Sequence, residues 1–480
     1  MSKKEKIDPE YYMEKAPVSK AIRYMAIPMI LMTMIDVIYN MTDAYFIGML
    51  NNTAMLAAIT LAMPFMVLTM AISMLFSIGG STFVSRLMGE KNTEKTKLVS
   101  STSFWFSVIS GAIVGVVCLI FLTPLVHLFG AGGDVFPYAR DYVMILAAGS
   151  PFLIANFVLS GLIRGEGASK VALMGLLISV LANLILDPIF IFGLNGGIMG
   201  AAVALIVGNI LSVSYYIYHI TSKSRVESVS LKHFTPSKEI LTEIFKVGVG
   251  GLMMAGFMFI SMLVFNNYFA MYGDAAVAGF GVGFRVVQIS DAVGMGITEG
   301  VVPLIAYAYS AGNFVRLKEL LRKTAIYLAS VTILMAVILS VIRSPLIGLF
   351  SSDPEVISMG GQVLTIMLLA TIFAAFASFF EGIFQAFGKG MQSSVMGIVR
   401  GASLMPIVIV MNALFLLNGV LWSSLVADVL ACALGLVLWY TLKKKGLERP
   451  ATGADRTDGQ NMIAEGPEVT AGKEIIQATN

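Results

Sequence analysis

Charged residues are scarce in this sequence. Of its 480 residues, 13% are Asp, Glu, Lys or Arg, against roughly 25% in a soluble domain, and 57% are hydrophobic. This composition excludes an ordinary soluble fold and predicts an integral membrane protein. The net charge of +3 is too small to indicate a nucleic-acid partner.

Residues that carry redox, metal or phosphate chemistry are also few. The two cysteines, Cys118 and Cys432, both lie in apolar segments, as small buried hydrophobic residues do. Only three histidines are present, and no glycine-rich phosphate loop or nucleophile motif is found. The sequence therefore predicts neither an enzyme nor an ATP-driven pump, and it predicts no cofactor.

Long apolar runs are what the sequence has in abundance. Runs of about 20 residues or more are long enough to cross a bilayer as helices. They predict twelve transmembrane helices, near residues 21–49, 54–86, 97–124, 135–160, 169–195, 197–221, 243–272, 275–309, 318–345, 355–386, 391–416 and 420–442. The expected fold is all-α and multi-pass, with the lipid bilayer around it and no removable signal peptide.

Lysine and arginine are distributed unequally between the connections. Basic residues such as Lys91 and Lys389, and the long segment 223–246, belong to one set of connections. The other set, for example NNT at 51–53 and NGG at 195–197, is short and almost free of them. The positive-inside rule therefore predicts that the basic side, with both termini, faces the cytoplasm of a cell membrane.

The longest connection lies near the midpoint and divides the chain into halves that resemble each other. GGSTFVSRLMGEKN at 79–92 recurs as GVVPLIAYAYSAGN at 300–313, an offset of about 221 residues. Six helices per half is an even number, so the two bundles are expected to be related by a pseudo-two-fold axis along the membrane normal, with a cavity between them. The predicted parts are a cytoplasmic N-terminal segment (1–20), an N-terminal six-helix bundle (21–221), a cytoplasmic linker (222–242), a C-terminal six-helix bundle (243–442) and a disordered cytoplasmic tail (443–480).

The stretch LANLILDPIFIFG at 181–193 places polar atoms within an apolar span. Asn183 and Asp187 are four residues apart and share one helix face. Pro188 lacks an N–H and clashes with the Leu184 carbonyl, which frees that oxygen beside them. A carboxylate at membrane depth costs at least about 2.5 kcal/mol. We therefore predict a proton or ion site here; the alternative is a buried Asp that serves packing only.

The first predicted helix carries a second polar face. Asp36, Asn40 and Asp43 are spaced by four and three residues and are expected to point into the N-terminal bundle. If Asp43 faced Asp187, repulsion between the two carboxylates would favour binding of a proton. The alternative is that Asp43 lies at the outer end of its span and is hydrated.

The C-terminal half has no counterpart of the Asn183 and Asp187 pair, but it carries other charges. Asp291 and Glu299 are eight residues apart and share a face, whereas Arg285 and Asp291 are six apart and could point to different sides. Acids that line a poorly screened cavity would select cationic substrates. Pro303, which follows Glu299 closely, would open the backbone there. The alternative is that Arg285 or Arg400 neutralises these acids.

Several stretches together resemble the multidrug and toxic compound extrusion (MATE) family, and within it the MepA-like multidrug exporters. They include IYNMTDAYFIG (38–48), ANLILDPIFIFG (182–193), EGVVPLIAYAYSAGN (299–313) and MNALFLLNGVLWSSLVAD (411–428), and the resemblance covers about residues 10–445. It implies two six-helix bundles in a V. It also implies antiport of bulky, often cationic, small molecules against entering H⁺ or Na⁺, with no obligate protein partner.

The resemblance also assigns roles to particular residues. It implies that Pro28 kinks the first helix, that Asp43 is the first-helix carboxylate and that Asn183 and Asp187 are the ion-site pair. These last three residues could hold Na⁺, but Leu205 stands where some sodium-coupled members have a hydroxyl residue. A proton needs only one carboxylate, so both coupling ions stay open. A lipid-linked precursor flippase of the same superfamily is the alternative function, for which a more basic cavity and extra helices are expected.

Overall fold

The computed structural model describes residues 9–49, 52–350 and 353–444, and within these ranges the chain is helical and contains no strand. In chain order the elements are α1 (Pro9–Glu14), α2 (Val18–Gly48), α3 (Thr53–Gly89), α4 (Thr93–Ile120), α5 (Leu122–Leu128), α6 (Val135–Gly165), α7 (Ser169–Pro188), the π-helix η1 (Ile189–Gly193), α8 (Gly197–Ser222), the 3₁₀ turn η2 (Leu231–His233), α9 (Lys238–Ala270), α10 (Asp274–Ser310), α11 (Phe314–Val341), α12 (Arg343–Gly348), α13 (Pro354–Ala386), α14 (Gly390–Ala402) and α15 (Leu404–Lys444). The predicted all-α membrane fold is confirmed.

The number of spans depends on a turn inside α15. In the described part of the chain, eleven helical segments are long and apolar enough to cross a membrane, with Gly390–Lys444 counted as one. Leu416, at φ 52° and ψ −136°, breaks the helical path of α15. An added Cβ at Gly419 would lie 1.9 Å from the Met411 carbonyl oxygen, so the chain folds back closely at this turn. If the break at Leu416 divides this last segment in two, with α14 and the start of α15 before it and the rest of α15 after it, the count is the predicted twelve spans.

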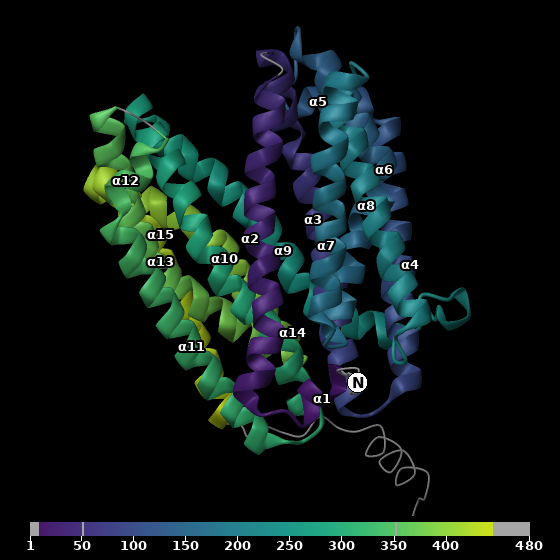
Figure 1. Ribbon diagram of the computed structural model, residues 1–480. Helices are drawn as coiled ribbons and strands as arrows, with labels where there is room; N and C mark the ends of the chain where they lie inside the picture. Colours follow the sequence, from purple (N-terminus) through teal and green to yellow (C-terminus); the bar gives the residue numbers. More distant parts are fainter. Residues whose placement is uncertain (1–8, 50–51, 351–352, 445–480) are drawn as a thin grey trace, which may run out of the picture.

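The helices form two bundles that meet at one end and diverge toward the other (Figure 1). One bundle contains α3 to α8, and the other contains α9 to α15. We call the end where α1 lies the terminal end, and the opposite end, where α5 and α12 lie, the open end. This V confirms the predicted two-bundle arrangement.

The helix α2 contacts both bundles. Along its first half it packs against α10, where an added Cβ at Gly296 or Gly300 would lie 2.6 Å from Ile30 or 2.8 Å from Ala26. The Thr33 hydroxyl donates a hydrogen bond to the Ala292 carbonyl of α10 at 2.7 Å. Helix α2 also packs against α7. Sequence periodicity predicted a helix here but could not show that it joins the two bundles.

Glycines bring the bundles into backbone contact near the terminal end. An added Cβ at Gly79 of α3 would lie 2.2 Å from the Ile244 carbonyl oxygen of α9, and one at Gly248 of α9 would lie 1.9 Å from the Leu75 carbonyl oxygen of α3. An added Cβ at Gly89 would likewise lie 2.5 Å from the Tyr307 carbonyl oxygen of α10. Any side chain at these positions would push the bundles apart, so the closed state of this end depends on glycine.

The short helix α1 is fixed to the C-terminal bundle by one arginine. The Arg316 guanidinium of α11 donates hydrogen bonds to the carbonyl oxygens of Tyr12, Met13 and Ala16 at 2.8, 3.0 and 2.7 Å. Carbonyls at a helix C-terminus have no partner within the helix, and a cation satisfies them well. Helix α1 and the residues that follow it are therefore held against α10 and α11.

The connection between the bundles is attached to α4 along much of its length. Ser100 donates to the Ser228 carbonyl and accepts from the Ser228 N–H, and Trp105 donates to the Val229 carbonyl. Thr102 makes the same two-way contact with Thr235. Helix α9 begins at Lys238, so residues 238–242 of the predicted linker are helical.

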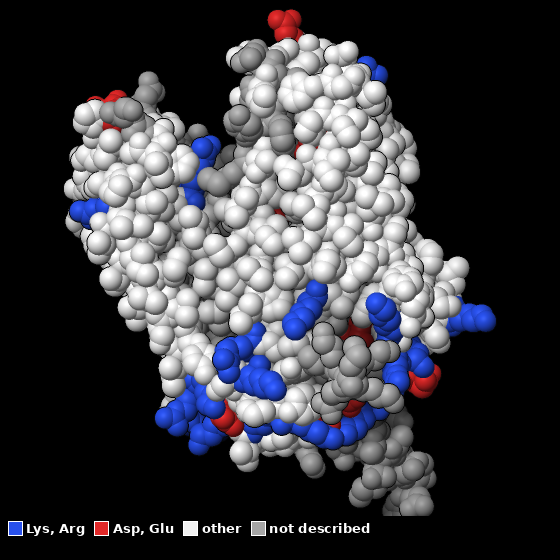
Figure 2. Space-filling model, in the orientation of Figure 1, with Lys and Arg blue, Asp and Glu red and all other residues white. Residues whose placement is uncertain are grey.

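Basic side chains gather at the terminal end on the face shown in Figure 2, with isolated ones toward the open end. This is the distribution that the positive-inside rule uses, and the sequence assigned this side to the cytoplasm.

Candidate functional site

The first polar site lies within the N-terminal bundle on α7. Asn183 and Asp187 are 1% and 2% exposed, deep within an apolar span. The Asn183 amide donates a hydrogen bond to the Tyr39 hydroxyl of α2 at 3.1 Å. An added Cβ at Gly208 of α8 would lie 2.6 Å from Asn183 Oδ1, so glycine leaves the space that the amide fills. Helices α2 and α8 therefore cover this face of α7.

The backbone changes character directly after Asp187. Helix α7 ends at Pro188, and the next five residues form the π-helix η1. Proline removes a backbone donor, and π-helical turns occur often at functional sites because they widen the helix and redirect carbonyls. Asn183 Oδ1 is a buried oxygen for which the described residues provide no hydrogen-bond partner. This oxygen is available to a bound proton donor or a cation.

The predicted polar face of α2 is only partly described. Asp36 is exposed, while Asn40 and Asp43 lie within α2 but their side chains fall outside the described part. The contact residue that sequence reasoning missed is Tyr39, three residues after Asp36. That spacing on a helix is the signal that could have identified it.

The second polar site consists of two ion pairs, which we call the central ion pairs. Arg164 at the end of α6 pairs with Glu299 of α10, with Nη1 and Oε2 2.5 Å apart, and so joins the two bundles. Arg400 of α14 pairs with Glu381 of α13 at 2.6 Å. The Glu299 side chain is 39% exposed, whereas that of Glu381 is 4% exposed. Glu299 is therefore the carboxylate that a solute could reach.

The other predicted cavity residues take different positions. Asp291 of α10 and Asp428 of α15 both lie within electrostatic range of Arg400. Arg285 is exposed and belongs to none of the ion pairs found in the described part of the chain. Pro303 lies inside α10 and does not end it. The sequence considered Arg285 and Arg400 as partners for the acids, but it did not anticipate Arg164.

Two further ion pairs join the bundles closer to the terminal end. Arg86 of α3 and Glu243 of α9 are 3.1 Å apart, and Lys95 of α4 and Glu239 of α9 are 2.7 Å apart. Together with the glycine contacts, they hold this end closed while the open end is splayed.

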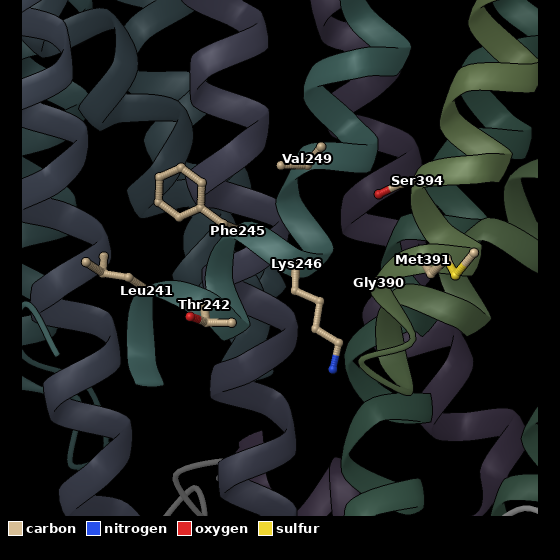
Figure 3. A pocket seen from close by; sticks show the side chains of 8 residues that line it. All are labelled: Leu241, Thr242, Phe245, Lys246, Val249, Gly390, Met391 and Ser394. Carbon is tan, nitrogen blue, oxygen red and sulfur yellow. The ribbon is translucent and has the colours of Figure 1, made fainter. Parts of the chain in front are cut away.

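A surface groove of about 510 Å³ lies between α9 and α14 (Figure 3). Its lining is mainly apolar, with Phe245, Val249 and Met391 on its walls and Lys246 beside it. It contains no residue of α2, α7 or α10, so it is separate from both polar sites.

An acidic pair lies outside the membrane-spanning helices. Glu227 of the linker is 4% exposed, and neither of its carboxyl oxygens has a hydrogen-bond partner among the described residues. The neighbouring Glu166 accepts a hydrogen bond from the Ser224 hydroxyl at 2.9 Å. Burial raises the pKa of the Glu227 carboxyl well above its ordinary value, and the nearby Glu166 carboxylate raises it further.

Two bundles that enclose charged and polar groups at membrane depth define a multi-pass membrane transporter. The model of the MatE family matches residues 28–189 and 249–414, and this chain belongs to that family.

Named relatives and solved structures agree with this assignment. The chain is 35% identical over 435 residues to the multidrug export protein MepA of Staphylococcus aureus, covering 91% of this chain and 96% of that protein. It is 34% identical, with the same coverage, to MepA of Staphylococcus haemolyticus. A multidrug resistance MATE family transporter, solved in an outward-facing conformation, matches with a TM-score of 0.86 at 23% identity over 93% of this chain and 99% of that one.

Proposed function

We propose that this protein is a multidrug efflux antiporter of the cell membrane, which exports bulky, often cationic, small molecules by alternating access in exchange for H⁺ or Na⁺. Its similarity to multidrug export proteins along nearly the whole chain supports the export of drugs. The observation that carries the coupling role is the burial of Asp187 and Asn183 at the π-helical break of α7, in contact with α2.

Asp187 is proposed as the coupling carboxylate, assisted by Asn183 and Asp43. A buried carboxylate cannot remain charged without a partner, so each stable state must supply a proton, a cation or a hydrogen-bond donor. A change in what Asp187 binds therefore changes the relative free energies of the two end states.

Helix α2 is proposed to carry this change to the rest of the molecule. Near the coupling site, Tyr39 of α2 contacts Asn183. Earlier in α2, the backbone of Ala26 lies against Gly300 of α10, and that of Ile30 lies against Gly296. Pro28 lies inside the helix, next to these α10 contacts, where a missing hydrogen bond makes bending easier. Movement of α2 at the coupling site would therefore be transmitted to α10 of the C-terminal bundle.

Glu299 and Asp291 are proposed to attract cationic substrates. The central ion pairs contain two arginines and two glutamates, and the carboxyl groups of Asp291 and Asp428 also lie within electrostatic range of Arg400, so acidic groups outnumber basic ones here. An acidic surplus favours cation export over the lipid-linked precursor flippase, for which a more basic cavity is expected.

The test of the coupling role is Asp187→Asn, assayed for surface expression, drug binding and uphill transport in proteoliposomes with separately imposed pH and Na⁺ gradients. We expect a folded protein that binds drug and loses gradient-driven export. Glu94→Gln, which removes an exposed carboxylate at the terminal end, serves as the matched control. Wild-type uphill transport by the Asp187 variant would place the coupling site elsewhere. Loss of expression would indicate a structural role.

A further inference from the structure

The ion pair between Arg164 and Glu299 has features of an exchangeable contact. It uses a single nitrogen of the guanidinium, and Arg164 Nε is buried without a hydrogen-bond partner among the described residues. A guanidinium that binds a carboxylate through two parallel hydrogen bonds would be held more firmly. The 39% exposure of the Glu299 side chain makes this carboxylate accessible to a competing ligand.

Arg164 and a cationic substrate would need the same carboxylate. Glu381 is bonded to Arg400 and Gln385 and is 4% exposed, so among the carboxylates of the central ion pairs only Glu299 is accessible. Arg164 comes from the N-terminal bundle, and Glu299 from the C-terminal one. Binding of a cation to Glu299 would therefore release a contact that joins the bundles.

We propose that Arg164 is a tethered competitor of cationic substrates for Glu299. It neutralises Glu299 when the site is empty and is displaced when a cation binds, so that substrate binding loosens the closed terminal end. This inference rests on the proposed role of Glu299 in substrate binding. It adds Arg164 as a residue that determines which substrates bind and that links their binding to the contact between the bundles. A ligand shifts a conformational equilibrium only through its different affinity for the two states, and breaking this ion pair provides such a difference.

The test compares equilibrium binding of tetraphenylphosphonium, a lipophilic cation, with that of triphenylphosphine oxide, an uncharged relative, to the purified full chain. Arg164→Gln should tighten binding of the cation by roughly fivefold, since a partly exposed ion pair no longer has to be broken. Binding of the neutral compound should stay unchanged. Arg164→Lys, which keeps the charge without the planar group, should lie between Arg164→Gln and the wild type.

Arg86→Gln provides the matched control, because Arg86 also forms a partly buried ion pair between the bundles but does not contact Glu299. If Arg164 acted only as a structural tie, both glutamine variants would change the binding of both compounds alike, and the proposal would be wrong. Unchanged or weaker cation binding by Arg164→Gln would also overturn it. Because these measurements need no ion gradient, their outcome is independent of whether Asp187 couples transport to H⁺ or Na⁺.

Discussion

At the scale of single residues, the structure divides the acids of this protein by what surrounds them. Asp187 is 2% exposed, Glu381 is buried in an ion pair with an arginine, and Glu299 forms an ion pair but is accessible. A carboxylate that is both charged and accessible can bind a solute, whereas a fully buried one responds to protons or small ions. The two proposed roles therefore follow from exposure and pairing, which sequence does not show.

Glu299→Gln tests the substrate role directly. Removing the carboxylate should reduce export of cationic compounds by about fivefold or more, because an attraction in a poorly screened site is lost. Export of neutral compounds should change little. Resistance profiles of cells that express each variant, normalised to surface expression, measure the two effects. Equal loss for cationic and neutral compounds would contradict a charge-based role.

At the scale of elements, the sequence predicted what local composition determines. Apolar length identified the spans, and Asn183, Asp187 and Pro188 identified a polar break in α7, because these signals lie within one segment. The sequence could not predict that α2 packs on α10, that Tyr39 contacts Asn183 or that Arg164 meets Glu299. These contacts join residues 135 or more positions apart, and they depend on how the bundles are placed.

The linker is a second element whose behaviour its sequence did not reveal. A polar, charged connection between two bundles suggests a flexible tether, but this one is bonded to α4 by Ser100, Thr102 and Trp105. Glu227, itself part of the linker, is buried, and its carboxyl oxygens have no hydrogen-bond partner in the described part of the chain. The linker is therefore fixed to the N-terminal bundle through residues 228–235.

Glu227→Gln should stabilise the linker at neutral and alkaline pH. The pKa of the Glu227 carboxyl is raised in the folded state, so the folded protein favours the protonated form. The contribution of Glu227 to the stability of the linker is then greatest at low pH, and it is lost as pH rises through the folded-state pKa of this carboxyl. The variant should remove this loss, by about 1–3 kcal/mol for a buried polar group. Amide hydrogen exchange across residues 224–235 at several pH values measures the stability of the linker. If the variant showed the same pH dependence as the wild type, ionisation of Glu227 would not be the cause of the loss of stability.

At the scale of the whole molecule, the V is closed at the terminal end by glycine contacts and ion pairs and is splayed at the open end. Our proposal of export by alternating access requires the terminal end to face the cytoplasm. In that orientation the open end admits ions from outside and releases drug, and the terminal end must open for drug to enter. Membrane orientation and the closed end are therefore linked and can be tested together.

Lys223→Cys tests the orientation. Lys223 is exposed at the start of the linker, and replacing Cys118 and Cys432 first would leave a single thiol. We expect a membrane-impermeant maleimide to label this cysteine only after the cells are made permeable. Labelling in intact cells would place the linker outside and reverse the proposed direction of transport.

Gly248→Ala tests whether the closed terminal end depends on backbone contact between the bundles. The new Cβ would lie 1.9 Å from the Leu75 carbonyl oxygen, and backbone atoms cannot move aside as a flexible side chain can. The variant should shift the population toward states with this end open, which would appear as faster hydrogen exchange in the facing parts of α3 and α9.

Gly256→Ala on the same helix is the matched control, because no atom lies within 4 Å of its added Cβ. Alanine there should leave exchange between the bundles unchanged and stabilise α9 by about 1 kcal/mol. Similar exchange in both variants would mean that the ion pairs, and not the glycine contacts, keep the terminal end closed.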